Sequence, residues 1–253
     1  MQRPNFSLDG KVAVITGASR GIGSAVAAAL AQSGAAVALL GRDARALAAT
    51  ADALAAAGCR AQYFCADVAD VASIEAAFEQ VERSLGHIDI LINNAGIEQV
   101  CASLDVTEAL WDRIVGTNLK GAFFAAQAAG RRMPSGGSIV NICSLTSEVG
   151  IAGAAPYGAS KSGLAGLTRA LATEWAARGI RVNGIGPGYF RTALTESFYR
   201  NEQWQRTMLP KIPLQRFGRL EDLGGAAVFL CSDAAAYITG QVLYVDGGLL
   251  AAL

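Results

Sequence analysis

Short apolar runs alternate along the chain with longer alanine-rich segments in which apolar residues recur at helical spacing. The short runs are almost continuously Val, Ile and Leu, as buried parallel strands are, and the longer segments suit crossover helices. The expected strands are residues 11–16, 36–41, 61–65, 90–93, 138–143, 181–185 and 242–245. The expected helices are residues 22–32, 44–57, 71–84, 107–132, 157–178 and 221–231. This order predicts an α/β fold, a single doubly wound, Rossmann-type domain over residues 1–253 with a seven-stranded parallel sheet flanked by helices.

One stretch breaks the alternation. Residues 189–217 are rich in aromatic and polar side chains and show no sustained strand or helix pattern. A structureless stretch of that length inside a compact domain usually serves a function, so we interpret it as a small substrate lobe or lid.

Composition and charge exclude several classes of protein. The chain has 21 basic and 21 acidic side chains, so a zero net charge gives no footprint for nucleic acid or an anionic membrane. No apolar stretch approaches the ~18 residues of a membrane span, and the polar N-terminus lacks a signal-peptide core. The one histidine, His87, cannot build a multi-histidine metal site, so we expect no metal. Five cysteines without a C-x-x-C pair fit reduced thiols, and we expect a cytoplasmic protein.

A glycine-rich turn follows the first expected strand. Gly17, Gly21 and Gly23 stand where that strand meets a helix, so the backbone could approach a pyrophosphate held by the helix dipole. The spacing is G-x-x-x-G-x-G, whereas the general dinucleotide fingerprint is G-x-G-x-x-G. The turn alone therefore leaves a purely steric role for these glycines open.

Tyr157 and Lys161 stand four residues apart at the start of an alanine-rich helix, with Pro156 in its first turn. Their side chains should share one helix face. A phenol with a pKa near ~10 is a poor acid at neutral pH, but we expect the Lys161 ammonium, and a positively charged ring of a bound dinucleotide, to lower that pKa. Tyr157 could then exchange a proton with a carbonyl or alcohol oxygen, although a plain surface Tyr and Lys is the alternative.

Four motifs in register resemble those of the short-chain dehydrogenase/reductase family. They are Thr16-Gly17-x-x-x-Gly21-x-Gly23, Asn93-Asn94-Ala95-Gly96, Tyr157-x-x-x-Lys161 and Pro187-Gly188, and the resemblance runs from Leu8 to Leu249. It implies an NAD(P)(H)-dependent enzyme that transfers hydride between the nicotinamide and a secondary alcohol or ketone. It also implies a homotetramer, with a dimer as the alternative.

The resemblance assigns the site residues as well. It implies a catalytic set of Asn118, Ser144, Tyr157 and Lys161. In that set Ser144 donates a hydrogen bond to the substrate oxygen, and Asn118 anchors a water near Lys161, although a buried Asn could also serve helix packing. The implied cofactor residues are Gly17, Ser19, Arg20, Gly21, Ile22, Gly23, Arg42, Asp67, Val68, Asn94, Ala95, Gly96, Tyr157, Lys161, Pro187, Gly188 and Thr192. Asp67 would contact the adenine, but it or Asp70 could instead cap the next helix.

The end of the second expected strand bears on the choice between NAD and NADP. An acid there would bind the ribose 2′-hydroxyl of NAD, but this chain has Gly41 followed by Arg42. Arg20 and Arg42 suit the 2′-phosphate of NADP, because a guanidinium pairs with phosphate oxygens in a fork. We expect NADP(H), with NAD(H) as the alternative if Asp43 turns inward.

Further tracts resemble gluconate 5-dehydrogenases and related sugar-acid dehydrogenases, which favours a sugar acid or polyol as the small-molecule substrate. They are Asn141-Ile142-Cys143-Ser144 with Ser147-Glu148, residues 183–189 and residues 243–248. That group carries basic residues just after Asn-Asn-Ala-Gly, whereas Glu98 stands here and would repel a carboxylate unless Arg191 compensates. We therefore expect a less anionic or more apolar substrate. The candidate substrate residues are Glu98, Leu145, Glu148, Tyr189, Phe190, Phe198, Trp204 and Met208.

Other functions stay open at this point. A 3-oxoacyl-thioester (acyl-carrier-protein) reductase would use the same catalytic residues, and basic residues of the lobe could dock an acidic carrier: Arg200, Arg206, Lys211 and Arg216. A general carbonyl reductase is a related alternative. A non-catalytic NADP-binding protein is a remote one, because the catalytic set is intact.

Overall fold

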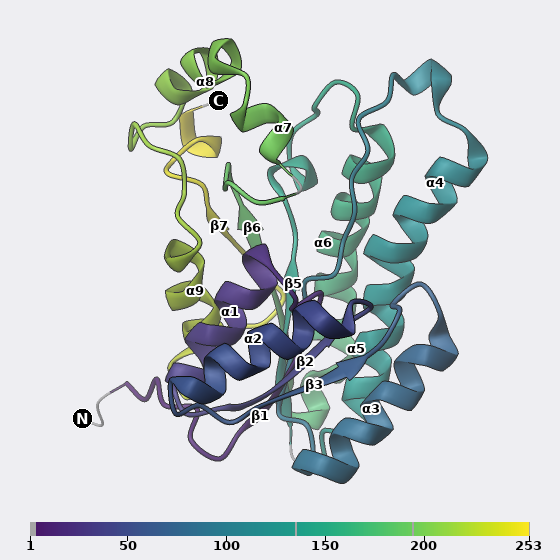
Figure 1. The fold of residues 1–253 in the computed structure, drawn as a ribbon, viewed down its shortest axis with the longest axis vertical. Helices are drawn as coiled ribbons and strands as arrows, with labels where there is room; N and C mark the ends of the chain where they lie inside the picture. The colour runs from purple at the N-terminus through teal and green to yellow at the C-terminus, as the bar shows by residue number, and fades with distance from the viewer. Residues whose placement is uncertain (1–3, 135, 194, 253) are drawn as a thin grey trace.

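A parallel seven-stranded sheet forms the centre of the computed structural model, which describes residues 4–134, 136–193 and 195–252 (Figure 1). The strand order is β3-β2-β1-β4-β5-β6-β7, so the predicted fold class is confirmed. The order reverses between β1 and β4, and ligands of such sheets bind at this switch point, beyond the carboxyl ends of the strands. The strands are β1 (Val12–Thr16), β2 (Ala36–Gly41), β3 (Ala61–Cys65), β4 (Ile90–Asn93), β5 (Gly137–Ile142), β6 (Ile180–Pro187) and β7 (Val242–Val245).

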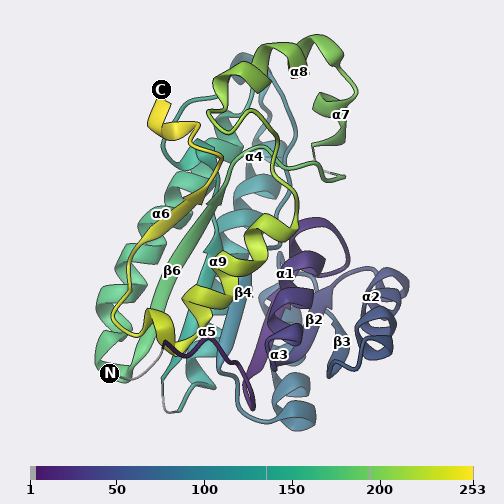
Figure 2. The same ribbon diagram turned by 90° about the vertical axis from the view of Figure 1, so that its left-hand side faces the viewer.

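Helices cover both faces of the sheet (Figure 2). Alternate side chains of β1 show the two cores: Ile15 packs beneath the first group of helices, and Val14 packs beneath the second. The first group is α1 (Gly21–Gln32), α2 (Ala44–Ala56) and α9 (Glu221–Cys231). The second group is α3 (Val71–Leu85), α5 (Gly121–Arg131) and α6 (Ala155–Trp175), with α4 (Glu108–Val115) packed against α6.

The helix expected over residues 107–132 is not continuous. A π-helical turn at Gly116–Lys120 separates α4 from α5, and it turns Asn118 into the interior. The helix expected to end at Arg178 instead stops at Trp175 and continues as a 3₁₀ turn, Ala176–Arg178. The remaining short 3₁₀ turns are Ser103–Asp105, Leu145–Ser147, Asp233–Ala235 and Leu250–Ala252.

Residues 189–217 contain ordered helices, so the expectation of a structureless stretch is wrong. They form α7 (Glu196–Tyr199), α8 (Glu202–Met208) and a 3₁₀ turn, Leu209–Lys211, while Leu194 lies outside the described residues. Trp204 organises this lobe, because its ring lies 5.2 Å from Tyr189, 5.4 Å from Tyr199 and 5.7 Å from Phe217 between ring centroids. These helices are too short to show a periodic pattern, and aromatic packing holds them.

The two ends of the lobe meet at the sheet. The backbone N–H of Gly218 donates to the carbonyl oxygen of Tyr189 at 2.9 Å, and Phe190 and Gly218 form an isolated parallel bridge. The lobe therefore leaves the domain and returns to it at one place.

Three further features concern the described part of the chain as a whole. None of its helices is long and apolar enough to cross a bilayer, and none of its His, Cys, Asp and Glu side chains form a group of three that could hold a metal ion. All five cysteines lie in this part and are free thiols.

Candidate active site

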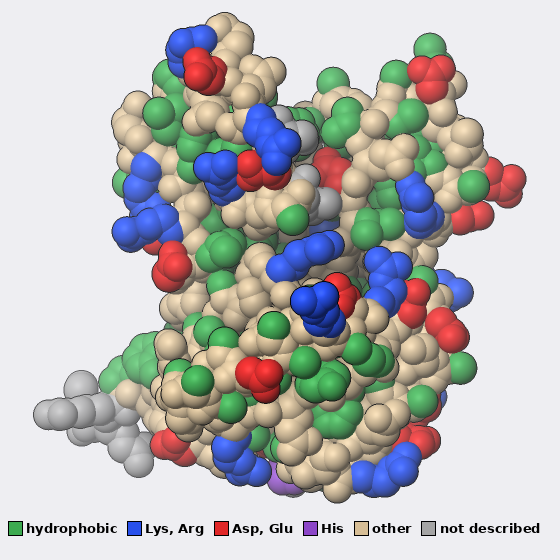
Figure 3. Space-filling view, in the orientation of Figure 1, with side chains coloured by type: hydrophobic (Ala, Val, Ile, Leu, Met, Phe, Trp, Pro, Cys, Tyr) green, Lys and Arg blue, Asp and Glu red, His purple; other side chains and the backbone are tan. Residues whose placement is uncertain are grey.

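A cavity of about 540 Å³ lies at the carboxyl edge of the sheet, between the switch point and the lobe. Its walls come from the segments that follow β1 to β6, so residues far apart in the sequence face one another. Figure 3 shows this side of the molecule hollowed at its middle, with Lys and Arg side chains along the rim.

The glycine turn forms one end of this cavity. Gly17 and Gly21 have φ of 66° and 61°, a left-handed conformation that glycine adopts without strain. A Cβ on Gly17 would lie 2.9 Å from the Cα of Ala95, so only a glycine lets the two loops approach. Among the described residues, no side chain caps the N-terminus of α1, which leaves its first N–H groups for an anionic ligand.

Gly23 has a different role from the one expected. It does not line the cavity, and a Cβ there would lie 2.3 Å from the carbonyl oxygen of Gly17 and 2.5 Å from Nδ2 of Asn94. Gly23 therefore lets α1 pack closely beneath the turn and shapes the binding loop from behind.

Asn94 ties the glycine turn to the end of β4. Its Nδ2 donates to the carbonyl oxygens of Thr16 and Gly17, both at 3.0 Å. The Oγ1 of Thr16 in turn accepts from the backbone N–H groups of Asn94 and Ala95, at 3.0 and 3.1 Å. The two loops that face a ligand at the switch point are thus held together by four hydrogen bonds.

Two arginines mark the end of the cavity beyond β2. Arg20 and Arg42 are exposed, both line the cavity, and Nη1 of Arg42 lies 3.8 Å from Oδ2 of Asp67. Asp43 also lines it, but its Oδ1 accepts from the backbone N–H of Ala46 at 3.0 Å as the N-cap of α2. Its carboxylate is therefore already engaged with the helix.

The cap of α3 settles a question that the sequence leaves open. Oδ1 of Asp70 accepts from the N–H of Ala72 at 3.0 Å and caps this helix. Asp67 and Val68 line the cavity instead. Asp67 thus faces the cavity while its Oδ1 accepts from the backbone N–H of Ala69 at 3.0 Å, and Asp70 caps the helix.

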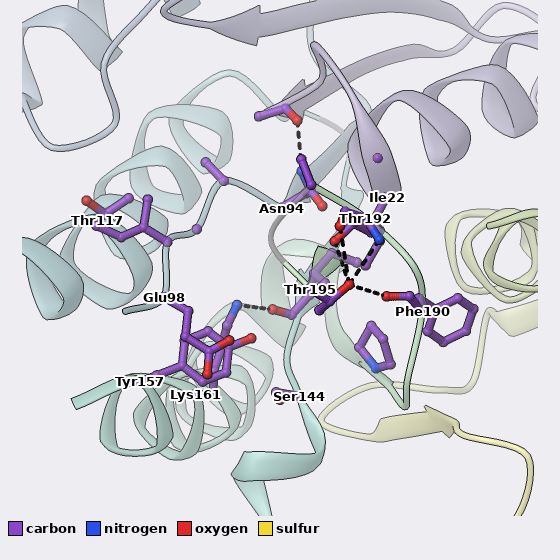
Figure 4. Close-up of a pocket in the computed structure, with 18 of the residues that line it drawn as sticks. Ile22, Asn94, Glu98, Thr117, Ser144, Tyr157, Lys161, Phe190, Thr192 and Thr195 are labelled. Atoms are coloured by element: carbon purple, nitrogen blue, oxygen red, sulfur yellow. Dashed lines mark hydrogen bonds between the residues drawn. The ribbon is translucent and has the colours of Figure 1, made fainter. Parts of the chain in front are cut away.

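Tyr157 and Lys161 share one face of α6 and reach the other end of the cavity (Figure 4). The Lys161 Nζ lies 5.7 Å from the centre of the Tyr157 ring and donates to the carbonyl oxygen of Ile142 at 2.6 Å. Lys161 is only 4% exposed, and this burial lowers its pKa to about 8. The predicted placement of the pair on one face is confirmed.

The protein's own groups raise the pKa of the Tyr157 phenol, whereas the lowering expected from Lys161 together with a bound nicotinamide stays a prediction. Burial raises the pKa of Tyr157 well above its usual range, and the nearby Glu98 carboxylate raises it further, while a hydrogen bond with Ser144 acts in the opposite direction. Lys161 is not among the groups that shift this pKa. The phenol therefore stays protonated at neutral pH.

Asn118 is 1% exposed and does not line the cavity. Its Oδ1 accepts from the backbone N–H of Ile97 at 2.8 Å, and its Nδ2 donates to the carbonyl oxygen of Ile97 at 2.9 Å and to Oγ of Ser160 at 3.1 Å. The Asn118 side-chain amide thus binds both the backbone N–H and the carbonyl of Ile97, the residue before Glu98. Asn118 therefore positions the loop after β4.

The substrate end of the cavity contains six of the eight expected residues: Glu98, Leu145, Tyr189, Phe190, Phe198 and Trp204. Glu148 and Met208 do not line it. Oε1 of Glu148 accepts from the Tyr244 hydroxyl at 2.8 Å, and Met208 lies half-buried at the end of α8. Arg191 forms a two-pronged ion pair with Glu196, at 2.9 and 2.8 Å, rather than facing a substrate.

Sequence reasoning missed several lining residues, of which Thr195 is the most connected. Its Oγ1 donates to the carbonyl oxygen of Phe190 at 2.6 Å and accepts from the backbone N–H of Thr192 at 3.0 Å. This holds Thr192 at the cavity wall. A threonine in a polar loop carries no periodic or motif signal. Further lining residues that were not predicted as site residues include Thr117, Thr146, Ile97 and Ile151.

Comparisons with known proteins agree with this geometry. The family model described as enoyl-(acyl carrier protein) reductase, which belongs to the short-chain dehydrogenases/reductases, matches residues 17–250. The chain is 43% identical to gluconate 5-dehydrogenase of Gluconobacter oxydans (strain 621H), with 100% of both chains covered. It is 41% identical to D-threitol dehydrogenase of Mycolicibacterium smegmatis (strain ATCC 700084 / mc(2)155), with 96% of this chain and 94% of that protein covered.

Solved structures are similar over nearly the whole chain. A Sinorhizobium meliloti 1021 protein assigned provisionally to the short-chain alcohol dehydrogenases is 60% identical, with a TM-score of 0.96 and coverage of 99% and 100%. A gluconate 5-dehydrogenase from Burkholderia cenocepacia J2315, in complex with NADP and tartrate, is 38% identical, with a TM-score of 0.96 and 99% of each chain covered. The chain belongs to the short-chain dehydrogenase/reductase family and is an NAD(P)-dependent oxidoreductase that acts on CH–OH and C=O groups.

Proposed function

We propose that this protein is an NADP(H)-dependent oxidoreductase that interconverts a secondary alcohol of a sugar acid or polyol and the corresponding ketone. The observation that carries the proposal is a continuous cavity that joins the uncapped N-terminus of α1 to Tyr157 and Lys161. A dinucleotide fits this arrangement, because Gly17 and Gly21 admit its pyrophosphate and no side chain of the described residues caps the helix there.

The arginines support NADP over NAD. Arg20 and Arg42 line the adenosine end, where a 2′-phosphate would accept their hydrogen bonds. The carboxylate that could favour NAD, Asp43, is occupied as the N-cap of α2. The NADP in the Burkholderia cenocepacia relative gives further support.

The catalytic roles proposed here follow from position and protonation. When bound, the nicotinamide supplies or accepts the hydride at the substrate carbon. Tyr157, whose raised pKa keeps it protonated, donates its proton to the carbonyl oxygen during reduction and becomes a phenolate; in the reverse direction it is this phenolate form that takes the proton from the alcohol. Ser144 donates a hydrogen bond to that oxygen as negative charge develops on it. The products of reduction are the alcohol and the oxidised nicotinamide, so hydride and proton are both accounted for.

Lys161 and Asn118 flank Gly96 in a way that supports a proton path. A Cβ on Gly96 would lie 3.6 Å from Nζ of Lys161 and 3.4 Å from Oδ1 of Asn118. Because Gly96 has no side chain, there is room for a water between the side chains of Lys161 and Asn118. In the proposed function, Lys161 also holds the ribose hydroxyls next to the nicotinamide.

Acyl-carrier-protein reduction is a weaker proposal. Three of the four basic lobe residues are already paired: Arg200 with Glu196 at 3.5 Å, Arg206 with Glu202 at 3.8 Å and Arg216 with Asp222 at 2.6 Å. These pairs reduce the positive charge that the lobe offers to an acidic carrier.

The cofactor proposal is tested by steady-state kinetics with NADPH and NADH. Arg42→Ala should lower kcat/KM for NADPH by about tenfold or more and change that for NADH little, because one charge-assisted bond is lost. Arg45→Ala is the matched control, since Arg45 is exposed on α2 and does not line the cavity. If both the original protein and Arg42→Ala prefer NADH, the proposal that NADP(H) is the cofactor is wrong.

The catalytic proposal is tested separately by Tyr157→Phe. Carbonyl reduction should fall by about 100-fold or more, while NADPH binding, followed by fluorescence, should stay close to the original. Unchanged turnover would remove Tyr157 from the mechanism.

The assembly and location proposed here follow the sequence. The chain is one domain over residues 1–253 with the substrate lobe at 189–217, and it forms a cytoplasmic homotetramer, with a dimer as the alternative. Support for assembly comes from large apolar side chains at the surface, among them Leu104 at 99% and Trp111 at 43% exposure. Light scattering coupled to gel filtration measures the number of subunits.

A further inference from the structure

Glu98 places an unpaired carboxylate beside the catalytic pair. It follows β4 on the loop that Asn118 fixes through Ile97, and it lines the cavity next to Tyr157 and Lys161 (Figure 4). Within the described ranges it makes no hydrogen bond to another side chain or to the backbone and no ion pair. Glu98, Tyr157 and Lys161 line the same cavity, and the Glu98 charge acts to raise the pKa of both Tyr157 and Lys161.

Among the described residues at this end of the cavity, Lys161 is the one cation near Glu98: burial raises the pKa of Glu98, and the Lys161 charge lowers it in part. The other lining side chains there are apolar, aromatic or hydroxylic: Leu145, Thr146, Ile151, Tyr189, Phe198 and Trp204. Lys161 is bound to the Ile142 carbonyl, and Arg191 is held by Glu196. Arg20 and Arg42 lie at the opposite end, beside Asp67. A substrate carboxylate would therefore meet an anion and find no available partner.

We propose that Glu98 selects neutral polyhydroxy compounds and excludes sugar-acid carboxylates, so that the substrate is a polyol or its keto form. The inference rests on the proposed function and narrows its substrate class. Two carboxylates in a half-buried site repel each other strongly, because little water screens them. A carboxylate also accepts hydrogen bonds from hydroxyl groups, which gives a polyol partners that a carboxylate substrate cannot use.

The experiment compares substrates that differ in charge alone. The first pair is D-gluconate and D-glucitol, in which a carboxylate replaces a CH₂OH group, assayed with NADP⁺. The second pair is 3-oxobutanoate and its ethyl ester, neither of which is a polyhydroxy compound. This pair is assayed with NADPH. Each pair is measured with the original protein, with Glu98→Gln and with the control Glu202→Gln, whose parent glutamate is exposed at the start of α8 and lies outside the cavity wall.

The proposal expects kcat/KM for the neutral member to exceed that for the anionic member by about tenfold or more in the original protein. Glu98→Gln should raise kcat/KM for the anionic member by about tenfold and change the neutral member far less, while Glu202→Gln alters neither ratio. A preference for the anionic member, or a ratio that Glu98→Gln leaves unchanged, overturns the proposal. So does a tenfold preference for an aminopolyol over D-glucitol, since the site would then select a cation.

The two proposals fail in different ways. Turnover of the ester pair alone, with the expected charge discrimination, leaves Glu98 as a filter against anions but removes polyhydroxy compounds as the substrate class. Turnover of D-gluconate in preference to D-glucitol keeps the proposed function and overturns the role of Glu98. No turnover of any of the four compounds overturns both.

Discussion

The Lys161 ammonium donates a 2.6 Å hydrogen bond to the carbonyl oxygen of Ile142, the last residue of β5. This bond ties α6 to the strand that leads into Ser144. It also leaves a buried positive charge with a neutral partner, which is why the pKa of Lys161 falls from its usual value of 10.5 to about 8. Lys161 is therefore held in place at a cost in stability.

That cost predicts that Lys161→Met is more stable than the original protein at neutral pH. A shift from 10.5 to about 8 corresponds to about 3 kcal/mol, from which the loss of a partner for the Ile142 carbonyl subtracts part. We expect a net gain of about 1–2 kcal/mol in the free energy of unfolding. Chemical denaturation measures it, and activity should be lost.

The pH dependence of this gain has a definite sign. Between pH 8 and 10.5 the unfolded chain keeps the Lys161 proton that the folded protein has released, so the original protein becomes more stable as pH rises through this window. The advantage of Lys161→Met should therefore shrink toward the upper end of the window. An advantage that grows with pH would contradict the assignment of a buried ammonium.

Ser144→Ala should lower kcat for carbonyl reduction by about 10- to 100-fold, because a donor to the developing oxyanion is lost. The change also removes the hydrogen bond that lowers the pKa of Tyr157, so the phenol holds its proton still more tightly. The KM for NADPH should change little. Ser84→Ala, at an exposed position of α3, is the control, and equal losses in both variants would argue against a catalytic Ser144.

Gly23→Ala should weaken nucleotide binding by about tenfold or more, because the new Cβ would collide with the Gly17 carbonyl oxygen and move the binding loop. Gly225→Ala is the matched control, since Gly225 also lies in a helix but has no atom within 4 Å of a Cβ. The control should be neutral or gain up to about 1 kcal/mol in stability. Titration of NADPH against each variant tests this; similar dissociation constants would exclude the packing role of Gly23.

Iodoacetamide at mildly alkaline pH should modify the exposed Cys65 and spare Cys143 and Cys231. Burial raises the pKa of Cys143 to about 11 and that of Cys231 to about 12, so neither thiol is appreciably ionised or accessible. Peptide mass spectrometry before and after denaturation gives the modified positions. Rapid labelling of Cys143 in the folded protein would show that the wall beside Ser144 opens.

The strands could be predicted closely where an apolar run ends in residues that turn the chain. The predicted bounds of β2 and β4 agree with the structure, since Gly41 and Asn93 each end an apolar run. β6 continues to Pro187 because β7 pairs with it along its whole end, and a partner strand is not visible in one segment of sequence. The π-helical turn at Asn118 keeps a helical pattern of side chains, so periodicity alone could not reveal it.

The candidate site, like the strands, could be predicted where it depends on local sequence and could not where it depends on distant segments. Motif spacing found the glycine turn and the pair on α6, because both depend on local geometry. The placement of Glu148 depends on Tyr244, which arrives from a strand nearly a hundred residues later. The high pKa of Tyr157 likewise depends on burial, which the assembled lobe and loops create. Such effects require the tertiary structure.

The bridge between Phe190 and Gly218 gives the lobe a practical property. A segment that starts and finishes at one point, with Trp204 at its own small core, can be replaced by another loop of different length without redrawing the sheet. Grafts within this segment that keep Thr192, one of the expected cofactor residues, would allow libraries of altered selectivity to be built on an unchanged sheet. Selection could then change the lobe residues that line the cavity, while Glu98, on the loop after β4, is varied separately.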